Sequence, residues 1–419
     1  MQKFDRALLV AANFRTDIKQ TEDSIIELEE LAKACNIEPI DKVIQSIDQI
    51  DPRYYIGSGK VEEIKKMIDI LNIDMVIFDD TLSPGQLRNL EKVLDTIIID
   101  RSFLILQIFA ERAKTKQAML EVALAQKLYM LPRLVGMGNS LSRQGGGSFN
   151  AKGPGETKLE LDRRRLQVEI SNLRKEIEKI KQTRATSRQK RLDNAIPIVA
   201  LVGYTNAGKS SLMNYFADKW GTDKTEVFEK NMLFATLDTK AKRIKKDNQP
   251  PFILIDTVGF ISKLPPELIA SFESTLADIQ DADLILHIVD GLNPSINQLE
   301  LTKSIIKQLG MEHTPRLLVV TKKDLRFSQP YIMEDYFYIS SKTGEGLDDL
   351  YQSIQSHLYD SSRITHLLIP FDQGAIYQQL KTETTVIETS YLDNGTYVKA
   401  VLTPRNIEKL KQYIIQKPN

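Results

Sequence analysis

Residues 203–210 read Gly203-Tyr204-Thr205-Asn206-Ala207-Gly208-Lys209-Ser210, which completes the pattern G-x-x-x-x-G-K-S. The pattern follows an apolar run that ends at Val202, and it precedes Ser211-Leu212-Met213, which can open a helix. Between a strand and a helix, the backbone N–H groups of such a loop point at phosphates, and the helix N-terminus adds partial positive charge. We therefore predict that residues 203–210 and Ser211 bind a nucleotide phosphate. The alternative is a glycine-rich turn that carries an incidental lysine.

A second motif supplies a carboxylate at the end of an apolar strand. Residues 253–256 read Ile-Leu-Ile-Asp and run into Thr257-Val258-Gly259. An aspartate there can hold Mg²⁺ through water, and a glycine lets its amide approach a γ-phosphate closely. Between the two motifs lies Phe234-Ala235-Thr236-Leu237, where a switch threonine would complete the metal shell. We predict that Ser210, Thr236 and Asp256 hold Mg²⁺, that Lys209, Thr236 and Gly259 are catalytic, and that Phe234 and Thr257 also contact the nucleotide.

Two further motifs indicate which base is bound. Residues 317–320 lead into Thr321-Lys322-Lys323-Asp324, and Ile339-Ser340-Ser341-Lys342-Thr343 follows another short apolar run. In this order the motifs resemble the five boxes of a TRAFAC-class GTPase. The Asp324 carboxylate can accept two hydrogen bonds from guanine N1–H and N2–H₂, which adenine does not offer. The predicted guanine-binding residues are Thr321, Lys322, Asp324, Ser340, Ser341 and Lys342.

The fourth box departs from the usual pattern because Thr321 stands where asparagine is commoner. A hydroxyl can still donate to purine N7, so we expect weaker guanine binding rather than lost specificity. The stems of Lys322 and Lys342 would flank the base. We therefore expect GTP and GDP as the ligands.

The residue after Gly259 departs from the Ras pattern. Ras-like proteins place a glutamine there to orient the attacking water, whereas this chain has Phe260, which can neither donate nor accept. Asn206 resembles the phosphate-loop asparagine of potassium-activated GTPases, in which a K⁺ ion would neutralise developing charge. The alternative is that Asn206 simply tolerates a turn conformation. Both interpretations predict slow intrinsic hydrolysis that a partner accelerates.

Length and composition favour a multidomain enzyme. The chain has 419 residues, which suggests two to four domains. Its 56 basic and 56 acidic side chains balance, so the net charge indicates no class of partner. A single cysteine, Cys35, excludes an intrachain disulfide framework and fits a reducing compartment, so we expect a cytoplasmic protein. No apolar run reaches the length of a membrane span, so we expect no stable membrane insertion. We also expect a monomer.

The N-terminal third alternates strand-like and helix-like runs. Residues 7–10, 43–50, 75–78 and 96–99 read as strands, and residues 23–34, 61–71 and 84–94 read as helices. Alternation at this spacing predicts a parallel sheet covered by helices. Gly57-Ser58-Gly59-Lys60 precedes one of these helices. It is either an anion site, which could even hold a second nucleotide, or a plain structural turn.

Beyond residue 104 the sequence predicts a helical hairpin. Residues 104–131 form one long helical stretch that Pro132 should stop, and residues 134–155 are rich in glycine. Residues 156–191 lack both Gly and Pro, and a heptad seam recurs at Leu166, Ile170, Leu173, Ile177 and Ile180. Loops as long as 134–155 are usually functional or disordered.

The charge of this hairpin is one-sided. Residues 143–191 hold fourteen basic and six acidic side chains, an excess of eight positive charges in a neutral protein. Such an excess suits a phosphate backbone, and the alternative is an ordinary solvated helix face. Aromatic residues are sparse there, so we expect recognition of RNA shape or backbone rather than base stacking. The candidate RNA-binding residues are Arg143, Gln144, Lys152, Lys158, Arg163, Arg164 and Arg165.

Together these motifs resemble one known family, HflX, the ribosome-associated GTPases. The residues that carry the resemblance are 55–60 (Tyr-Ile-Gly-Ser-Gly-Lys), 82–84, 88–91, 100–101, 108–113, 143–147, 153–157, 203–210, 234–238 and 256–260. The resemblance covers about residues 1–360, and the family's usual asparagine is replaced by Thr321. It implies an N-terminal α/β domain with a helical hairpin, a GTPase domain, and GTP-dependent binding to the large ribosomal subunit near its peptidyl-transferase centre. Family members split stalled or idle ribosomes into subunits, notably under stress.

The predicted fold class is therefore multidomain α/β. We expect an N-terminal parallel α/β domain over residues 1–103, a helical hairpin with a glycine-rich basic loop over 104–192, a P-loop GTPase domain over 193–360, and a small C-terminal α/β domain over 361–419. In that last domain, residues 365–370, 384–390 and 396–402 read as strands, and 374–380 and 404–415 as helices. Two functions remain open: a ribosome-splitting GTPase, and a GTP-gated RNA-binding factor in large-subunit assembly or RNA modification.

Overall fold

The structure is a computed structural model that describes residues 5–14, 18–134, 154–193, 196–221, 240–247, 249–257, 259–263, 279–326 and 328–415. The chain divides into two compact units. The first runs from Met1 to Ile180 and includes Ile261–Glu273, of which residues 261–263 are described. The second contains the described residues from Lys181 to Phe260 and from 279 onward. Each unit is described separately below.

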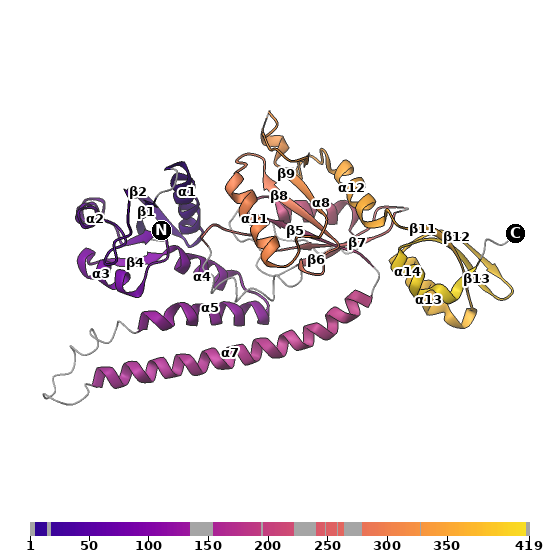
Figure 1. Cartoon of the computed structure of the whole chain (residues 1–419), viewed down its shortest axis with the longest axis horizontal. Coiled ribbons are helices and arrows are strands. Elements are labelled where there is room, and N and C mark those ends of the chain that lie inside the picture. Colours follow the sequence, from indigo (N-terminus) through magenta and orange to yellow (C-terminus); the bar gives the residue numbers. More distant parts are fainter. Residues whose placement is uncertain are drawn as a thin grey trace. The chain divides into compact units, whose positions relative to one another are not determined.

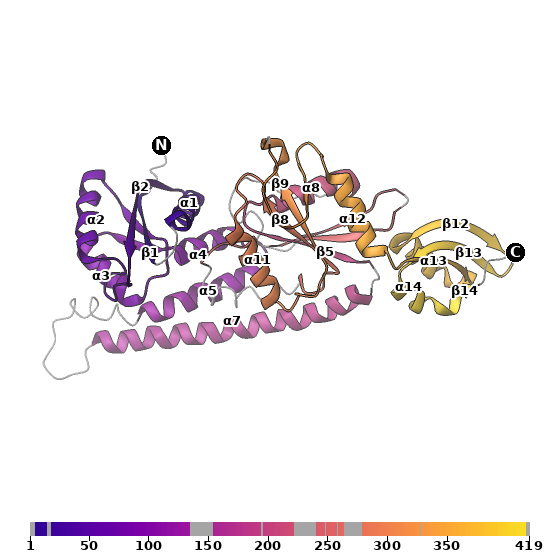
Figure 2. The same cartoon turned by 45° about the horizontal axis from the view of Figure 1, so that its top comes forward.

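The first unit is built on a four-stranded parallel sheet in the order β2-β1-β3-β4. Its elements alternate along the chain as β1 (Asp5–Phe14), α1 (Ile18–Ala34), β2 (Ile37–Ile47), α2 (Ser58–Leu71), β3 (Met75–Phe78), α3 (Pro84–Leu94) and β4 (Ile97–Asp100). Figure 2 shows α2 and α3 on one side of this sheet and α1 on the other. The predicted parallel α/β fold is confirmed.

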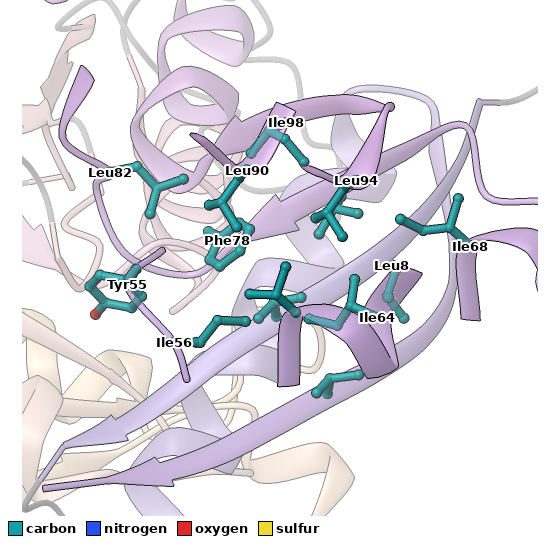
Figure 3. Close-up of a cluster of buried hydrophobic side chains, with 14 of the residues drawn as sticks. Leu8, Tyr55, Ile56, Ile64, Ile68, Phe78, Leu82, Leu90, Leu94 and Ile98 are labelled. Carbon is teal, nitrogen blue, oxygen red and sulfur yellow. The ribbon is translucent and has the colours of Figure 1, made fainter. Parts of the chain in front are cut away.

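The core of this sheet explains why the short apolar runs fold as strands. Leu8 and Val10 of β1, Val76 and Phe78 of β3, and Ile98 of β4 are all buried with the inner faces of α2 and α3. Figure 3 shows side chains of this cluster, including Tyr55 and Phe78. Their rings pack edge to face, with 6.3 Å between the ring centroids. Burial on this scale is the main favourable term in folding such a unit.

The start of β2 lies well before the predicted one. β2 begins at Ile37 rather than at residue 43, and it includes Pro39. Proline cannot donate to a ladder, so it is tolerated on edge strands and at irregularities. β2 is an edge strand, and its register with β1 shifts between Ala7 and Leu8, where Pro39 pairs with Ala7. The predicted strand therefore began too late, because a proline counts against a strand in the sequence although an edge strand tolerates it.

The predicted long helix 104–131 is wrong, because two helices stand in its place. These are α4 (Arg101–Arg112) and α5 (Lys116–Leu134), and Pro132 lies inside the second. The break follows Ala113, whose backbone is extended, and the Thr115 hydroxyl accepts from the N–H of Ala118, as an N-cap does. Pro132 lies only two residues from the end of α5, where little helix remains to be disrupted.

α5 packs along the helix α7 (Pro154–Asp193), and Figures 1 and 2 show the two side by side. Ile170 and Ile177 of the predicted seam are buried against Leu124, and Leu173 packs on the same cluster. The Lys127 ammonium pairs with Glu169 across the two helices at 2.7 Å. The heptad seam thus forms the contact that the hairpin prediction requires. The predicted glycine-rich loop falls almost entirely outside the described residues.

The second unit contains a six-stranded sheet in the order β10-β9-β8-β5-β7-β6, in which only β6 runs antiparallel to its neighbour. The strands are β5 (Ile198–Gly203), β6 (Lys240–Ile244), β7 (Phe252–Asp256), β8 (Leu284–Asp290), β9 (Arg316–Thr321) and β10 (Tyr336–Tyr338). The helices α8 (Lys209–Trp220), α11 (Ile296–Gln308) and α12 (Leu347–Tyr359) accompany them. β5 is buried along its whole length, as expected of a central strand in a parallel sheet.

The last part of the second unit is an antiparallel sheet in the order β12-β13-β11-β14. Its elements are β11 (Arg363–Ile369), α13 (Gly374–Glu383), β12 (Thr385–Leu392), β13 (Gly395–Leu402), α14 (Pro404–Lys409) and β14 (Ile414–Ile415). Figures 1 and 2 show α13 and α14 on one face of this sheet. The helix predicted over 404–415 is wrong in its second half, because Ile414 pairs with Leu367 and shares the apolar core of this sheet.

Across the described part of the chain, no helix is both long and apolar enough to cross a membrane.

Candidate functional site: a nucleotide-binding edge of the sheet

Most of the sequence motifs meet at one edge of the six-stranded sheet. The phosphate loop follows β5, Thr257 and Gly259 follow β7, the box that begins at Thr321 follows β9, and residues 339–342 follow β10. These four strands are parallel, so their carboxyl ends share an edge. In open α/β sheets this edge is where ligands bind.

The phosphate loop has the backbone that its sequence requires. Gly208 has φ +94° and Asn206 has φ +60°, so both residues lie in the left-handed region. Asparagine tolerates that region better than most residues, which supports the turn interpretation of Asn206. Thr205 is nearly buried, and within the described chain its hydroxyl oxygen has no hydrogen-bond partner. An orphaned polar atom in this loop fits a site that a polar ligand completes.

Lys209 opens α8 with its ammonium turned back into the loop. Nζ donates to the carbonyl oxygens of Gly203 at 3.0 Å and Tyr204 at 2.7 Å. Burial lowers the pKa of Lys209 to about 8, and the nearby Asp256 carboxylate opposes that shift by favouring the ammonium. Phosphate oxygens in place of two neutral carbonyls would satisfy the charge more completely.

Two of the three predicted metal ligands lie side by side. Ser210 Oγ donates to Asp256 Oδ2 at 2.7 Å, and Asp256 is fully buried at the end of β7. A hydroxyl and a carboxylate are oxygen donors of the kind that Mg²⁺ takes, and the metal usually keeps several waters besides. The donor set therefore fits Mg²⁺. Thr236, the third predicted ligand, lies outside the described residues, as does Phe234.

Gly259 sits directly against the phosphate loop. A Cβ placed on it would lie 2.7 Å from Thr205 Cα and 2.9 Å from Lys209 Nζ, so no larger residue fits without a shift. The next residue is joined to the same loop by its backbone: the Phe260 N–H donates to Gly203 O at 3.1 Å, and Phe260 O accepts from the Thr205 N–H at 2.8 Å. The Phe260 ring is buried, which explains an apolar residue at this position.

Thr321 is placed differently from the prediction. Its hydroxyl donates to Ala207 O at 2.7 Å, with Val289 O at 3.2 Å, and the residue is buried. A hydroxyl has one hydrogen, so the hydrogen given to Ala207 is not available to purine N7. The Thr321 side chain instead links the fourth box to the phosphate loop by a hydrogen bond. The sequence motif could not predict this partner.

Ser340 positions the carboxylate that is predicted to read guanine. Ser340 Oγ donates to Asp324 Oδ1 at 2.7 Å and accepts from the N–H groups of Lys342 at 3.2 Å and Thr343 at 3.1 Å. Ser340 is fully buried, whereas Asp324 is exposed and free to face a base. Ser341 has a buried hydroxyl oxygen that finds no partner in the described chain.

Asp290, the last residue of β8, is not among the residues predicted from the sequence. Its carboxylate pairs with the Lys322 ammonium at 2.7 Å, and both side chains are about one-fifth exposed. Lys322 also has φ +60°, so the backbone turns sharply there. Asp290 ends an apolar strand, as Asp256 does, so the same sequence pattern could have predicted it.

The remaining predicted residues are placed as follows. Ser211 lies in the first turn of α8, Thr257 is buried with its hydroxyl donating to Leu201 O at 2.6 Å, and Lys342 is exposed. Arg163, Arg164 and Arg165 are exposed on α7. Arg143, Gln144 and Lys152 lie outside the described residues, and of Lys158 only the helical backbone is described.

Comparison with known proteins covers nearly the whole chain. Residues 22–110 match the family described as "GTP-binding GTPase N-terminal", residues 112–191 match "GTP-binding GTPase Middle Region", and residues 198–322 match "50S ribosome-binding GTPase". Relatives named GTPase HflX include those of Caldanaerobacter subterraneus subsp. tengcongensis, 41% identical over 98% of this chain and 94% of the relative, and of Escherichia coli, 36% identical over 89% and 87%. The chain therefore belongs to the HflX family of GTPases.

Proposed function

We propose that this protein binds GTP at the carboxyl edge of the six-stranded sheet, hydrolyses it, and in its GTP form separates ribosomal subunits by binding the large one. The observation that carries the nucleotide assignment is the convergence of the phosphate loop, Asp256, Gly259 and the Ser340–Asp324 pair on one sheet edge. The ribosomal assignment draws support from the matched family description, "50S ribosome-binding GTPase".

In this proposal each residue acts through charge or position. The Lys209 ammonium and the loop N–H groups hold the β- and γ-phosphates, and Ser210 and Asp256 hold Mg²⁺ together with Thr236. When bound, the metal neutralises charge that develops on the phosphates. The Gly259 N–H contacts the γ-phosphate, and Asp324, oriented by Ser340, accepts from guanine. The Asn206 backbone adopts the left-handed turn conformation. Binding of K⁺ by its side chain stays a prediction.

The first test concerns the nucleotide. Titration of GDP and ADP should show guanine preference, and Asp324→Asn should shift preference towards xanthosine nucleotides, since an amide N–H matches the xanthine carbonyl. Lys209→Ala should abolish phosphate binding. If the protein bound guanosine and adenosine nucleotides alike, the assignment of the site would be wrong.

The ribosomal role depends on the basic helix α7. The side chains of Arg164 and Arg165 are 71% and 77% exposed, although Arg164 also pairs with Glu160 at 3.2 Å. Exposed arginines suit rRNA phosphates, and each neutralised phosphate releases counterions, so binding should weaken steeply with salt. We propose that residues 104–192 form the RNA-contacting hairpin, between an N-terminal domain over 1–103 and the GTPase domain over 193–360, followed by a C-terminal domain over 361–419.

Sedimentation of ribosomes distinguishes splitting from the alternative role in assembly or modification. With a non-hydrolysable GTP analogue, separated subunits would support splitting, whereas intact particles that carry bound protein would support the alternative. Arg163→Ala with Arg165→Ala should weaken binding to large subunits. The matched control is Lys65→Ala with Lys66→Ala, which removes the same charge from the exposed face of α2. Equal effects of both pairs would rule out a specific role for α7.

We further propose that the protein works as a monomer in the cytoplasm.

A further inference from the structure

The end of β8 lies between the two halves of the nucleotide site. In the six-stranded sheet, β8 has β9 on one side, which leads into the base-reading box (residues 321–324), and β5 on the other, which leads into the phosphate loop. Asp290 is the last residue of β8 and lies opposite Thr321 in the register with β9. The Lys322 ammonium reaches across to Asp290 Oδ2 at 2.7 Å. The Lys322 side chain therefore runs from the end of β9 to the end of β8, in the direction of the phosphate loop.

The Asp290 carboxylate is held in place by the turn that follows it. Its Oδ1 accepts from the Leu292 N–H at 2.9 Å, which leaves Oδ2 for the ammonium. This turn packs closely on the base-reading box, because a Cβ on Gly291 would lie 2.2 Å from Thr321 O. The Arg326 guanidinium also donates to Gly291 O at 2.8 Å. Asp290 is thus a fixed partner rather than a mobile surface carboxylate.

The backbone on both sides of Lys322 is fixed as well. The Thr321 hydroxyl before it donates to Ala207 O at 2.7 Å. The Lys323 N–H after it donates to Ile339 O at 3.0 Å. Lys322 itself has φ +60°, a left-handed backbone that a lysine adopts only where its surroundings hold it. With the backbone fixed, the long side chain is the freedom that remains, and the ion pair with the β8 carboxylate restrains it.

We propose that Asp290 is a positioning residue for the nucleoside: by binding the ammonium of Lys322, it holds the apolar stem of that lysine in place against one face of the purine. Lysine stems cover apolar surface while the charged head keeps a polar partner. Immobilising a long, flexible side chain opposes binding, so a stem that is already held raises the affinity. This inference rests on the proposed function, because it takes Lys322 as a residue that flanks the base.

The proposal makes a distinction between the face and the edge of the base. Asp324 reads the edge, where guanine offers an N2 amino group that hypoxanthine lacks. The Lys322 stem would contact the ring face, which is nearly the same in both bases. Loss of Asp290 should therefore weaken the binding of guanosine and inosine diphosphates by the same factor.

Asp290→Asn tests this, because the amide keeps an oxygen that can accept from the Leu292 N–H and loses the negative charge. The affinities for GDP and for inosine 5′-diphosphate are measured by calorimetry on the full chain. We expect both to fall by about two- to tenfold, the range for immobilising one long side chain, with their ratio unchanged. Charge alone predicts the opposite sign, since removal of a carboxylate that repels the phosphates would tighten binding.

A double-mutant cycle shows whether Asp290 acts through Lys322. Lys322→Met keeps an unbranched apolar side chain and removes the ammonium, so its loss of affinity should match that of Asp290→Asn. The double variant should bind no more weakly than either single variant, because both substitutions break the same contact. Asp335→Asn is the matched control: it removes an exposed carboxylate just before β10 and should change neither affinity.

The outcomes separate the inference from the function on which it rests. Losses that multiply in the double variant would show that Asp290 acts on its own turn and would overturn the inference. Unchanged or tighter GDP binding in Asp290→Asn, or an altered ratio of the two nucleotide affinities, would overturn it too. Failure of the parent protein to prefer guanosine over adenosine nucleotides would instead overturn the proposed function.

Discussion

The Thr321 hydroxyl donates its hydrogen to the carbonyl oxygen of Ala207 at 2.7 Å, which joins the base-reading box to the phosphate loop. The two residues are 114 positions apart in the chain, and Thr321 is buried at the end of β9. The bond therefore couples the two halves of the nucleotide site. A Cβ on Gly208 would lie 3.3 Å from the same hydroxyl, so loop and box are closely packed there.

Removal of this hydroxyl should weaken nucleotide binding. In Thr321→Val the side chain keeps its shape, but the Ala207 carbonyl loses its donor, and an unsatisfied buried group costs about 1–3 kcal/mol. If half of that cost, about 0.5–1.5 kcal/mol, falls on binding, the GDP dissociation constant rises roughly two- to thirteenfold. Thr321→Ser keeps the hydroxyl and should remain near the parent value. Equal GDP affinities for the valine and serine variants would show that the tether has no role in binding.

Loss of the Ser340 hydroxyl should reduce guanine recognition specifically. In Ser340→Ala the Asp324 carboxylate loses the donor that orients it, and a hydrogen bond to a charged group contributes about 1.5–3 kcal/mol. We expect GDP affinity to fall by about tenfold or more while the weak binding of ADP stays unchanged. Competition titrations with the two nucleotides measure this ratio. A parallel loss of ADP binding would point to a collapsed loop instead.

The pH dependence of binding should report on Lys209. Burial lowers the pKa of the nucleotide-free ammonium to about 8, and bound phosphates favour its charged form, so the pKa is higher in the complex. Binding therefore takes up a proton above pH 8, and GDP affinity falls as the pH rises through that range. Below pH 8 the ammonium is already charged, and affinity is flat with respect to this group. Calorimetry at pH 9 in two buffers of different ionisation enthalpy measures the uptake directly, and a heat independent of buffer would contradict it.

A methyl group on Gly259 should separate GTP from GDP. In Gly259→Ala the new Cβ meets Thr205 Cα at 2.7 Å and Lys209 Nζ at 2.9 Å, so the backbone must withdraw from the γ-phosphate position. We expect affinity for a GTP analogue to fall by about tenfold, ~1.4 kcal/mol, with hydrolysis lost and GDP binding within about threefold of the parent. Gly374→Ala, at a glycine with φ −57° and open space around its Cβ, controls for substitution of a glycine as such. A GDP affinity that falls as much as the analogue's would refute the γ-phosphate role.

Much of the fold was predictable because its signals are local. Helix α3 begins at Pro84 and ends at Leu94, as expected, since Ser83 and Gln86 form a capping box that the sequence displays. The division of the predicted helix 104–131 into α4 and α5 was not predictable, because the break after Ala113 depends on a Thr115 cap within an otherwise helical pattern. The strand Ile414–Ile415 was missed because two residues carry no periodicity, and only pairing with β11 makes them a strand.

The sequence by itself determined the phosphate loop, the strand-end carboxylate Asp256 and the order of the guanine boxes, because each is a contiguous motif whose chemistry follows from its own residues. Only the tertiary structure decided what Thr321 and Lys263 contact. Both side chains meet partners more than a hundred residues away, Ala207 and Asp79, and a motif cannot encode the direction of such a bond. That direction is set by which strands the chain brings together when its apolar faces are buried.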